Sequence, residues 1–217
     1  MKVLVACEES QAVCKAFRER GHEAYSCDII ECSGGHPEWH IKQDVLPLLN
    51  GGCEFCTEDG QIHTINGKWD LIIAHPPCTF MSKAGARWMF PKGELSQERY
   101  AKAMAAKEFF MQIFNAHCDR IAVENPRPLK IVELPQPHQV IQPYQFGHPY
   151  SKATCLWLKK LKPLKPTKIL SDYEPFLPSN TGGYARGMGG SRGVAHDSKT
   201  ASKTFKGIAK AMAEQWG

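Results

Sequence analysis

The strongest constraint on the fold of this chain is a repeated pattern in which short apolar segments alternate with amphipathic ones. The apolar segments have the length of β-strands, and the amphipathic ones carry apolar residues at helical spacing. We expect strands at Lys2–Ala6, Glu23–Cys27, Trp69–Ala74, Arg120–Val123 and Thr154–Leu158, and helices at Ser10–Arg20, Ser96–Ala116 and Ile208–Trp216. Because alternating strands and helices form a mostly parallel sheet with helices on both faces, the sequence predicts an α/β fold.

Polar clusters follow three of the predicted strands directly. Asp28 follows the second strand, His75-Pro76-Pro77-Cys78 the third and Glu124-Asn125-Pro126 the fourth. The carboxyl ends of parallel strands meet at one edge of a sheet, and ligands of such folds bind in the crevice beyond that edge. The sequence therefore predicts a functional site made from these three clusters.

The length of 217 residues suits a single domain with a small extension. We expect a core over residues 1–158 with a small β-hairpin inserted near residues 51–67, where Asp59-Gly60 and Asn66-Gly67 are turn signals. Residues 159–203 are basic and rich in Gly, Arg and Pro, which predicts a loop region. A closing helix within residues 204–217 is expected to pack back on the core.

The net charge of +5 is unevenly distributed along the chain. Residues 1–150 hold 15 Lys and Arg against 18 Asp and Glu, whereas residues 151–217 hold 12 against 4. A basic C-terminal third suits a surface that faces a polyanion, because phosphate neutralisation dominates nucleic-acid affinity. A solvated face that only keeps the protein in solution is the alternative.

Composition also argues against several classes of protein. No stretch approaches the roughly 18 consecutive apolar residues of a membrane helix, and Glu8 and Glu9 interrupt the apolar N-terminus too early for a secretory signal. We therefore expect a cytoplasmic protein of a bacterium or a phage-infected cell, with no membrane partner. Nine cysteines, an odd number, then indicate free thiols rather than a disulfide framework.

A metal site is considered at Cys53-x-x-Cys56, which is half of a zinc-binding pattern. Further ligand types stand nearby in sequence at Cys32, His36, His40 and His63. Structural zinc sites usually need a second pair at regular spacing, and only one Cys-x-x-Cys pair is present. We favour a hairpin that holds two thiols and expect no metal.

Cys78 and Glu124 are the residues that best suit catalysis. A thiol on a rigid Pro-Pro turn at a strand end acts as a nucleophile when a nearby positive charge or helix terminus lowers its pKa. Burial of Glu124 at the end of the next strand would raise the pKa of its carboxyl and allow it to share a proton with a substrate. The alternative is an inert buried cysteine. His75 either contacts the substrate or is simply hydrogen-bonded.

Three segments in the same order resemble motifs of the DNA cytosine-5 methyltransferases. Pro76-Pro77-Cys78 resembles the Pro-Cys nucleophile motif of that family, and Glu124-Asn125 resembles its Glu-Asn motif. The stretch Tyr144–Thr154 is similar to the family's Tyr-Gly-x-Pro-Gln-x-Arg-x-Arg block. The likeness spans most of the chain and is nearest to compact, phage-type members. Too few residues separate Leu158 from the closing helix for a sizeable target-recognition region.

The resemblance implies a Rossmann-like fold that uses S-adenosylmethionine and acts on DNA. The sequence does not determine the oligomeric state, and we favour a monomer. It implies methylation of cytosine C5 through addition of the Cys78 thiolate to C6, with Glu124 as the acid. The cofactor-binding residues implied are Glu8, Ser10, Asp28, Asp44 and Pro76. The residues implied in binding of the base or the DNA are Asn125, Lys152, Arg186 and Arg192.

The sequence departs from the family pattern at two places. The turn Ala6-Cys7-Glu8-Glu9-Ser10 lacks the glycines of the family's first motif, and Lys152 and Thr154 replace the two arginines of the later block. Acidic residues in that turn are equally what helix stability favours. Two other functions stay open: methylation of an amino group, since His75-Pro76-Pro77-Cys78 half fits the polar-Pro-Pro-aromatic motif of those enzymes, and an inactive nucleic-acid-binding relic of the fold.

Overall fold

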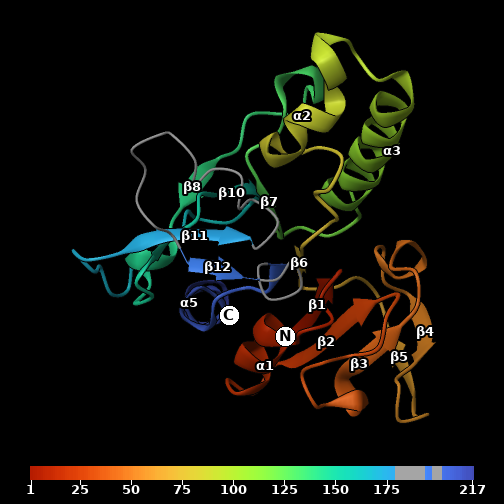
Figure 1. Cartoon of the computed structure of the whole chain (residues 1–217). Helices are drawn as coiled ribbons and strands as arrows, with labels where there is room; N and C mark the ends of the chain where they lie inside the picture. Colours follow the sequence, from red (N-terminus) through yellow and green to blue (C-terminus); the bar gives the residue numbers. More distant parts are fainter. Residues whose placement is uncertain (179–193, 197–201) are drawn as a thin grey trace.

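A seven-stranded, mostly parallel β-sheet forms the centre of the molecule (Figure 1). The structure is a computed structural model and describes residues 1–178, 194–196 and 202–217. The strands of the central sheet are β1 (Lys2–Ala6), β2 (Glu23–Asp28), β3 (His40–Lys42), β6 (Leu71–Ala74), β7 (Ile121–Pro126), β8 (Gln139–Ile141) and β10 (Thr154–Lys159). The five strands predicted from the sequence are all present in it.

The order of the strands is β3-β2-β1-β6-β7-β10-β8. β1 pairs in parallel with both β2 and β6, and β6 pairs in parallel with β7. β10 runs antiparallel to β7 and to β8. Counted along the chain within this sheet, the first five strands follow the order 3-2-1-4-5 of doubly wound Rossmann folds. The predicted Rossmann-like α/β fold is therefore confirmed by the topology of the sheet.

Helices cover both faces of the sheet (Figure 1). α1 (Ala12–Arg18) and α5 (Lys206–Trp216) pack against one face, and α3 (Gln97–Phe114) with the short α2 (Ala86–Met89) against the other. The first face is formed by Val3, Val5, Leu71 and Ile73, and the second by Leu4, Ala6, Ile72 and Ala74. Because both faces are buried, these strands read as continuous apolar runs rather than as alternating ones.

Two smaller sheets flank the central one. β4 (Cys53–Cys56) and β5 (Ile62–Ile65) form an antiparallel hairpin, whose Phe55 and Ile65 are buried in the same core as α3. β9 (Tyr150–Ser151), β11 (Glu174–Pro178) and β12 (Val194–His196) form a parallel three-stranded sheet. Short 3-10 helices lie at Pro37–Trp39, Leu46–Leu48, Lys83–Gly85, Pro91–Gly93, Lys130–Val132 and Pro143–Gln145. Within the described ranges no helix has the length and apolar character needed to cross a membrane.

The start of α5 lies directly against the backbone of the segment that precedes β9. A Cβ atom at Gly207 would lie 2.0 Å from the carbonyl oxygen of Phe146, and the Gly207 N–H donates to Nε2 of His148 at 2.8 Å. α5 can therefore approach this closely only because residue 207 has no side chain.

We predict that Gly207→Ala destabilises the fold by about 1–3 kcal/mol, because the added methyl group overpacks against a backbone oxygen. Alanine otherwise favours a helix over glycine by up to about 1 kcal/mol, so the sign of the effect is diagnostic. Urea denaturation measures it, with the exposed Lys210→Ala in the same helix as a control expected to change stability by less than about 0.5 kcal/mol. A stabilised Gly207→Ala variant would contradict the close contact.

Candidate active site

The parallel pairing of β6 with β7 brings two of the predicted polar clusters together. Ala74, the last residue of β6, is paired with Val123 in β7, so the next residues, His75 and Glu124, emerge side by side. The His75 N–H also continues the ladder with β1 by donating to the Ala6 carbonyl at 3.0 Å. The clusters that follow the third and fourth predicted strands thus form one site at the carboxyl edge of the sheet.

A buried hydrogen bond joins the side chains of His75 and Glu124. Nδ1 of His75 lies 3.0 Å from Oε2 of Glu124, and the two side chains are only 10% and 18% exposed. For Glu124, burial alone would raise the pKa, but the hydrogen bond and charge of His75, with the charge of Lys152, lower it below its ordinary value. For His75, burial works to lower the pKa, but the hydrogen bond and charge of Glu124, with the charge of Glu8, raise it overall.

These directions correct one expectation drawn from the sequence. The pKa of Glu124 was expected to rise through burial, whereas the structure lowers it because an imidazole donor faces the carboxylate. Glu124 is therefore ionised at rest near neutral pH. It can accept a proton before it can donate one.

Cys78 lies half-buried on the turn that follows β6. Its carbonyl accepts from the N–H groups of Met81 and Ser82 at 3.1 and 3.0 Å, which fixes the turn. Burial raises the pKa of the thiol, the negative charge of Glu124 raises it further, and the positive charge of Lys152 lowers it. The thiol is thus protonated at rest, with a carboxylate and an ammonium group close enough to act on it electrostatically.

Asn125 ties β7 to the Pro-Pro turn. Its side chain is only 3% exposed, and its Nδ2 donates to the carbonyl oxygen of Pro76 at 2.8 Å. This bond holds the turn that carries Cys78 against the strand that carries Glu124. Asn125 and Pro76 were both predicted to bind a ligand. In the structure, the Asn125 amide nitrogen and the Pro76 carbonyl bind each other.

Asp28 and Asp44, the two carboxylates expected at the cofactor, lie near the end of β1. Burial raises the pKa of the Cys7 thiol, and the charges of Asp28 and Asp44 raise it further. Asp28 Oδ1 accepts from the Ile30 N–H at 3.3 Å, and Asp44 Oδ1 accepts from the Leu46 N–H at 3.0 Å. Ile29 and Ile30 are 73% and 50% exposed beside Asp28. Acidic and apolar groups therefore lie together at this edge.

Glu8 lies in the turn between β1 and α1, and each of its carboxylate oxygens accepts a hydrogen bond from the first turn of α1. The side chain is buried, and its two oxygens accept from the N–H groups of Val13 and Cys14 at 2.7 and 3.1 Å. Burial raises the pKa of this carboxyl despite those bonds. The contacts are those of a helix cap, which favours the helix-stability alternative for Glu8. The partly buried Ser10 follows in the same turn.

The turn between β1 and α1 has the backbone of a glycine-rich loop without its glycines. Cys7 and Gln11 have φ values of 57° and 56°, in the left-handed region that glycine favours. Gln11 is fully buried, and its side chain donates to the carbonyl of His36 at 2.8 Å and accepts from the His36 N–H at 3.0 Å. Non-glycine residues in this conformation are concentrated at functional sites. The sequence gives no signal for them, because neither residue type predicts this backbone.

Lys152 lies beside Glu124. Its Nζ lies 5.9 Å from the ring centres of both Phe176 and Phe205. A small cavity beside it is lined by Glu124, Lys152, Thr154, Ser202, Lys203, Thr204, Phe205 and Ile208. Glu124 and Lys152 thus line one cavity, and the charges of both act on the Cys78 thiol. His75, also a candidate from the sequence, is hydrogen-bonded to Glu124. Arg186 and Arg192 lie outside the described residues.

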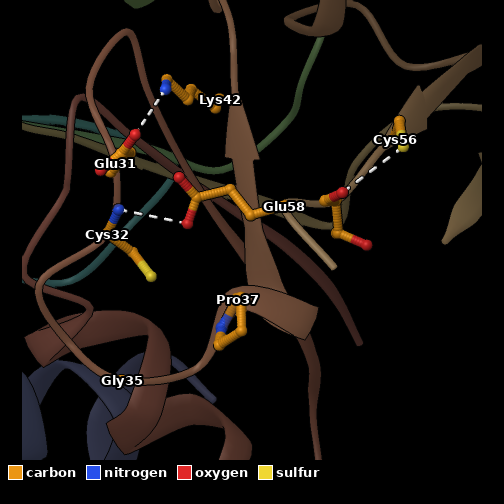
Figure 2. A pocket seen from close by; sticks show the side chains of 8 residues that line it. Glu31, Cys32, Gly35, Pro37, Lys42, Cys56 and Glu58 are labelled. Carbon is orange, nitrogen blue, oxygen red and sulfur yellow. Dashed lines mark hydrogen bonds and ion pairs between the residues drawn. The ribbon is translucent and has the colours of Figure 1, made fainter. Parts of the chain in front are cut away.

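A second, larger hollow lies between the loop after β2 and the β4 strand (Figure 2). Its volume is about 690 Å³, and it is lined by Glu31, Cys32, Gly35, Pro37, Lys42, Cys56, Thr57 and Glu58. Lys42 forms an ion pair with Glu31 at 3.0 Å, and the Cys32 N–H donates to Glu58 at 3.3 Å. Two of the cysteines considered for zinc line this hollow, but the described residues contain no group of three or more His, Cys, Asp or Glu placed to hold a metal ion.

Solved structures similar to this chain include a DNA methyltransferase homologue of an insect. No family model and no curated protein matches the chain. Among solved structures, the chain is similar to a mutant DNMT2 of Spodoptera frugiperda, with 16% sequence identity and a TM-score of 0.36. The match covers 82% of this chain and 55% of that chain, so it spans little more than half of the solved protein.

We predict that Asn125→Asp destabilises the fold more than Asn125→Ala does. The alanine variant loses one buried hydrogen bond and leaves the Pro76 carbonyl unpaired, at a cost of about 1–3 kcal/mol. The aspartate variant in addition places a carboxylate oxygen against that carbonyl in a buried position. Urea denaturation at neutral pH ranks the two, and an Asn125→Asp variant as stable as the wild type would show that the bond to Pro76 does not form.

Proposed function

We propose that this protein transfers a methyl group from S-adenosylmethionine to C5 of cytosine in DNA, with Cys78 as the nucleophile and Glu124 as its proton partner. The observation that supports the proposal is that Cys78, in the turn after β6, lies close enough to Glu124, 46 positions later in the adjacent parallel strand β7, for the carboxylate charge to act on its thiol. The charge of Glu124 acts on the Cys78 thiol, and that of Lys152 acts on both groups. A nucleophile, an acid–base group and a cation share one edge of the sheet.

The chemistry requires this combination because cytosine C5 is a weak nucleophile. Addition of a thiolate to C6, with a proton supplied at N3, makes C5 resemble the carbon of an enamine. C5 can then attack an electrophilic methyl group, after which a base removes the C5 proton and the thiolate leaves. A base in duplex DNA must first be flipped out of the stack, at a cost of a few kcal/mol.

The resting protonation states of Cys78 and Glu124 together suit the first step, which is formation of the thiolate. Cys78 holds a proton that it must lose, and Glu124 is an ionised acceptor. Transfer of the thiol proton to Glu124, directly or through a water molecule, produces a thiolate and a carboxylic acid at once. As the thiolate forms the S–C6 bond, Glu124 passes that proton to N3. The positive charge of Lys152 stabilises the thiolate meanwhile.

The residues near the end of β1 suit an adenosyl group. Carboxylates such as Asp28 and Asp44 accept hydrogen bonds from hydroxyl and amino groups, and the exposed Ile29 offers an apolar surface for a purine ring. S-adenosylmethionine bound there would supply the electrophilic methyl group. Ser10 and Pro76 belong to the same edge, whereas the carboxylate of Glu8 already caps α1.

DNA is the proposed polyanionic substrate. Lys152 adjoins Glu124, and the basic segment 151–217 includes Arg186 and Arg192, whose roles at the DNA backbone stay predictions. The short stretch between Leu158 and the closing helix favours recognition of a short sequence or of none.

The nucleophile is tested by Cys78→Ser. We expect this variant to lose both methylation and the covalent adduct with DNA that contains 5-fluorocytosine, because a serine hydroxyl is rarely ionised at neutral pH. The matched control is Cys56→Ser, which alters an exposed thiol of the hairpin and should leave adduct formation intact. Nucleoside digestion and mass spectrometry then show whether the methyl group is on C5 or on an amino group. Adduct formation by Cys78→Ser would overturn the proposed mechanism.

Cofactor binding is tested separately by calorimetry with S-adenosylmethionine. We expect Asp28→Ala to weaken binding about tenfold or more, as the loss of a hydrogen bond to a charged group of about 1.5–3 kcal/mol implies. Asp59→Ala, which changes an exposed carboxylate of the hairpin, should bind as the wild type does. Equal affinity of the Asp28→Ala variant would remove Asp28 from the cofactor site, and no binding by the wild type would favour a relic without activity.

A further inference from the structure

The His75 side chain has one hydrogen-bond partner among the described residues, and that partner is Glu124. Nδ1 makes the 3.0 Å bond, whereas Nε2 is buried and makes no hydrogen bond in the described part of the chain. An ionised carboxylate only accepts hydrogen bonds, so Nδ1 carries the proton and donates it to Oε2 of Glu124. The polar contacts of this buried ring are therefore directed at Glu124 alone.

The backbone around His75 is fixed from three directions, and the ring itself is buried and bonded to Glu124. The His75 N–H extends the hydrogen-bond ladder with β1. The next residue, Pro76, has a φ angle fixed by its ring, and its carbonyl accepts from Asn125 at 2.8 Å. The bond from Nδ1 uses Oε2 and leaves Oε1 of Glu124 without a hydrogen bond to His75. His75 thus determines which carboxylate oxygen remains for other contacts.

We propose that His75 is a positioning residue whose Nδ1 holds Oε2 of Glu124 and leaves Oε1 available, so that Glu124 acts first as a base toward Cys78 and then as an acid toward the pyrimidine. This inference rests on the proposed function. The proton leaves the Cys78 thiol, forms a bond to Oε1 of Glu124, and moves to N3 as the S–C6 bond forms and the C5–C6 π electrons shift into the ring. The Nδ1 proton stays on His75 throughout.

The electrostatic surroundings agree with this role. The charged and titratable groups that act on His75 are Glu8 from the turn after β1, Glu124 from β7 and Lys152 from the segment after β9. The two carboxylates raise the pKa of His75 and the ammonium group lowers it, with an overall rise. A protonated His75 is in turn the largest influence that lowers the pKa of Glu124 against the effect of burial.

Loss of the imidazole should therefore raise the pKa of Glu124. Because the first step needs an ionised Glu124, the acidic limb of the pH profile should move to higher pH. We expect His75→Ala to shift the acidic limb of the rate of adduct formation with 5-fluorocytosine DNA upward by about one pH unit or more. That shift corresponds to about a tenfold loss of rate below the limb. His75→Asn keeps a donor near the position of Nδ1, so it should recover part of the maximal rate and show a smaller shift.

A role confined to packing would lower the rate of His75→Ala equally at every pH. An unchanged acidic limb in His75→Ala would therefore overturn the inference, even if the variant were slower. The pH profile of Cys56→Ser provides the control for a thiol distant from the pair.

A second measurement needs no activity and separates the inference from the proposed function. NMR of the full chain with 15N-labelled histidine gives the pKa of His75 directly, and His75→Asn assigns its signal. We expect a pKa above the ordinary histidine value that falls in Glu124→Gln, because the partner that raises it is neutralised. An unchanged His75 pKa in Glu124→Gln would overturn the pair. If the His75 pKa falls in Glu124→Gln as expected but no adduct forms at any pH, the pairing of His75 with Glu124 is upheld and cytosine methylation is rejected.

Discussion

The parallel pairing of β6 with β1 and β7 is the constraint on which the site depends. Both faces of these strands are buried, so their register is set by the packing of α1 and α5 on one side and α3 on the other. That register places His75 beside Glu124 and holds the turn of Cys78 next to β7. A shift by one residue would turn every side chain to the opposite face, and the clusters at the strand ends would separate.

At rest, the proposed nucleophile Cys78 is a neutral thiol and the proposed acid Glu124 is a carboxylate. A nucleophile and an acid ready to react would have the opposite protonation states. Burial keeps the thiol of Cys78 protonated, while the hydrogen bond from His75 keeps Glu124 ionised. Transfer of one proton from Cys78 to Glu124 gives a thiolate and a carboxylic acid. These two groups then need a substrate that accepts the sulfur and the proton at the same time. A pyrimidine that is attacked at C6 and protonated at N3 meets that need.

Much of the sheet can be predicted from the sequence because its strands are continuous apolar runs. β1 matches its expected bounds, and β2, β6, β7 and β10 differ from theirs by a few residues. β3 and β8 have three residues each, too few to show a period, and they depend on pairing with strands already formed. The predictions also omitted β9, β11 and β12, which are likewise short or lie in the proline-rich and basic region.

The sequence indicates the candidate site residues more clearly than it indicates their protonation states. Glu124 stands directly after an apolar run, and Cys78 follows one after a short His-Pro-Pro turn, which is a visible signal. The direction of the Glu124 pKa depends on the register between β6 and β7, which places His75 against it and cannot be derived from either segment alone. Similarly, the left-handed Cys7 and Gln11 give the turn after β1 a backbone that its residue types do not predict.

The central claim is that Cys78 and Glu124 act together on a cytosine base. The most direct test is to incubate the wild-type chain with S-adenosylmethionine and DNA that contains 5-fluorocytosine, digest any covalent complex, and map the modified peptide by mass spectrometry. We expect a single adduct on the peptide that contains Cys78, and its loss in Glu124→Ala. An adduct on another cysteine, or none under conditions in which S-adenosylmethionine binds, would contradict it.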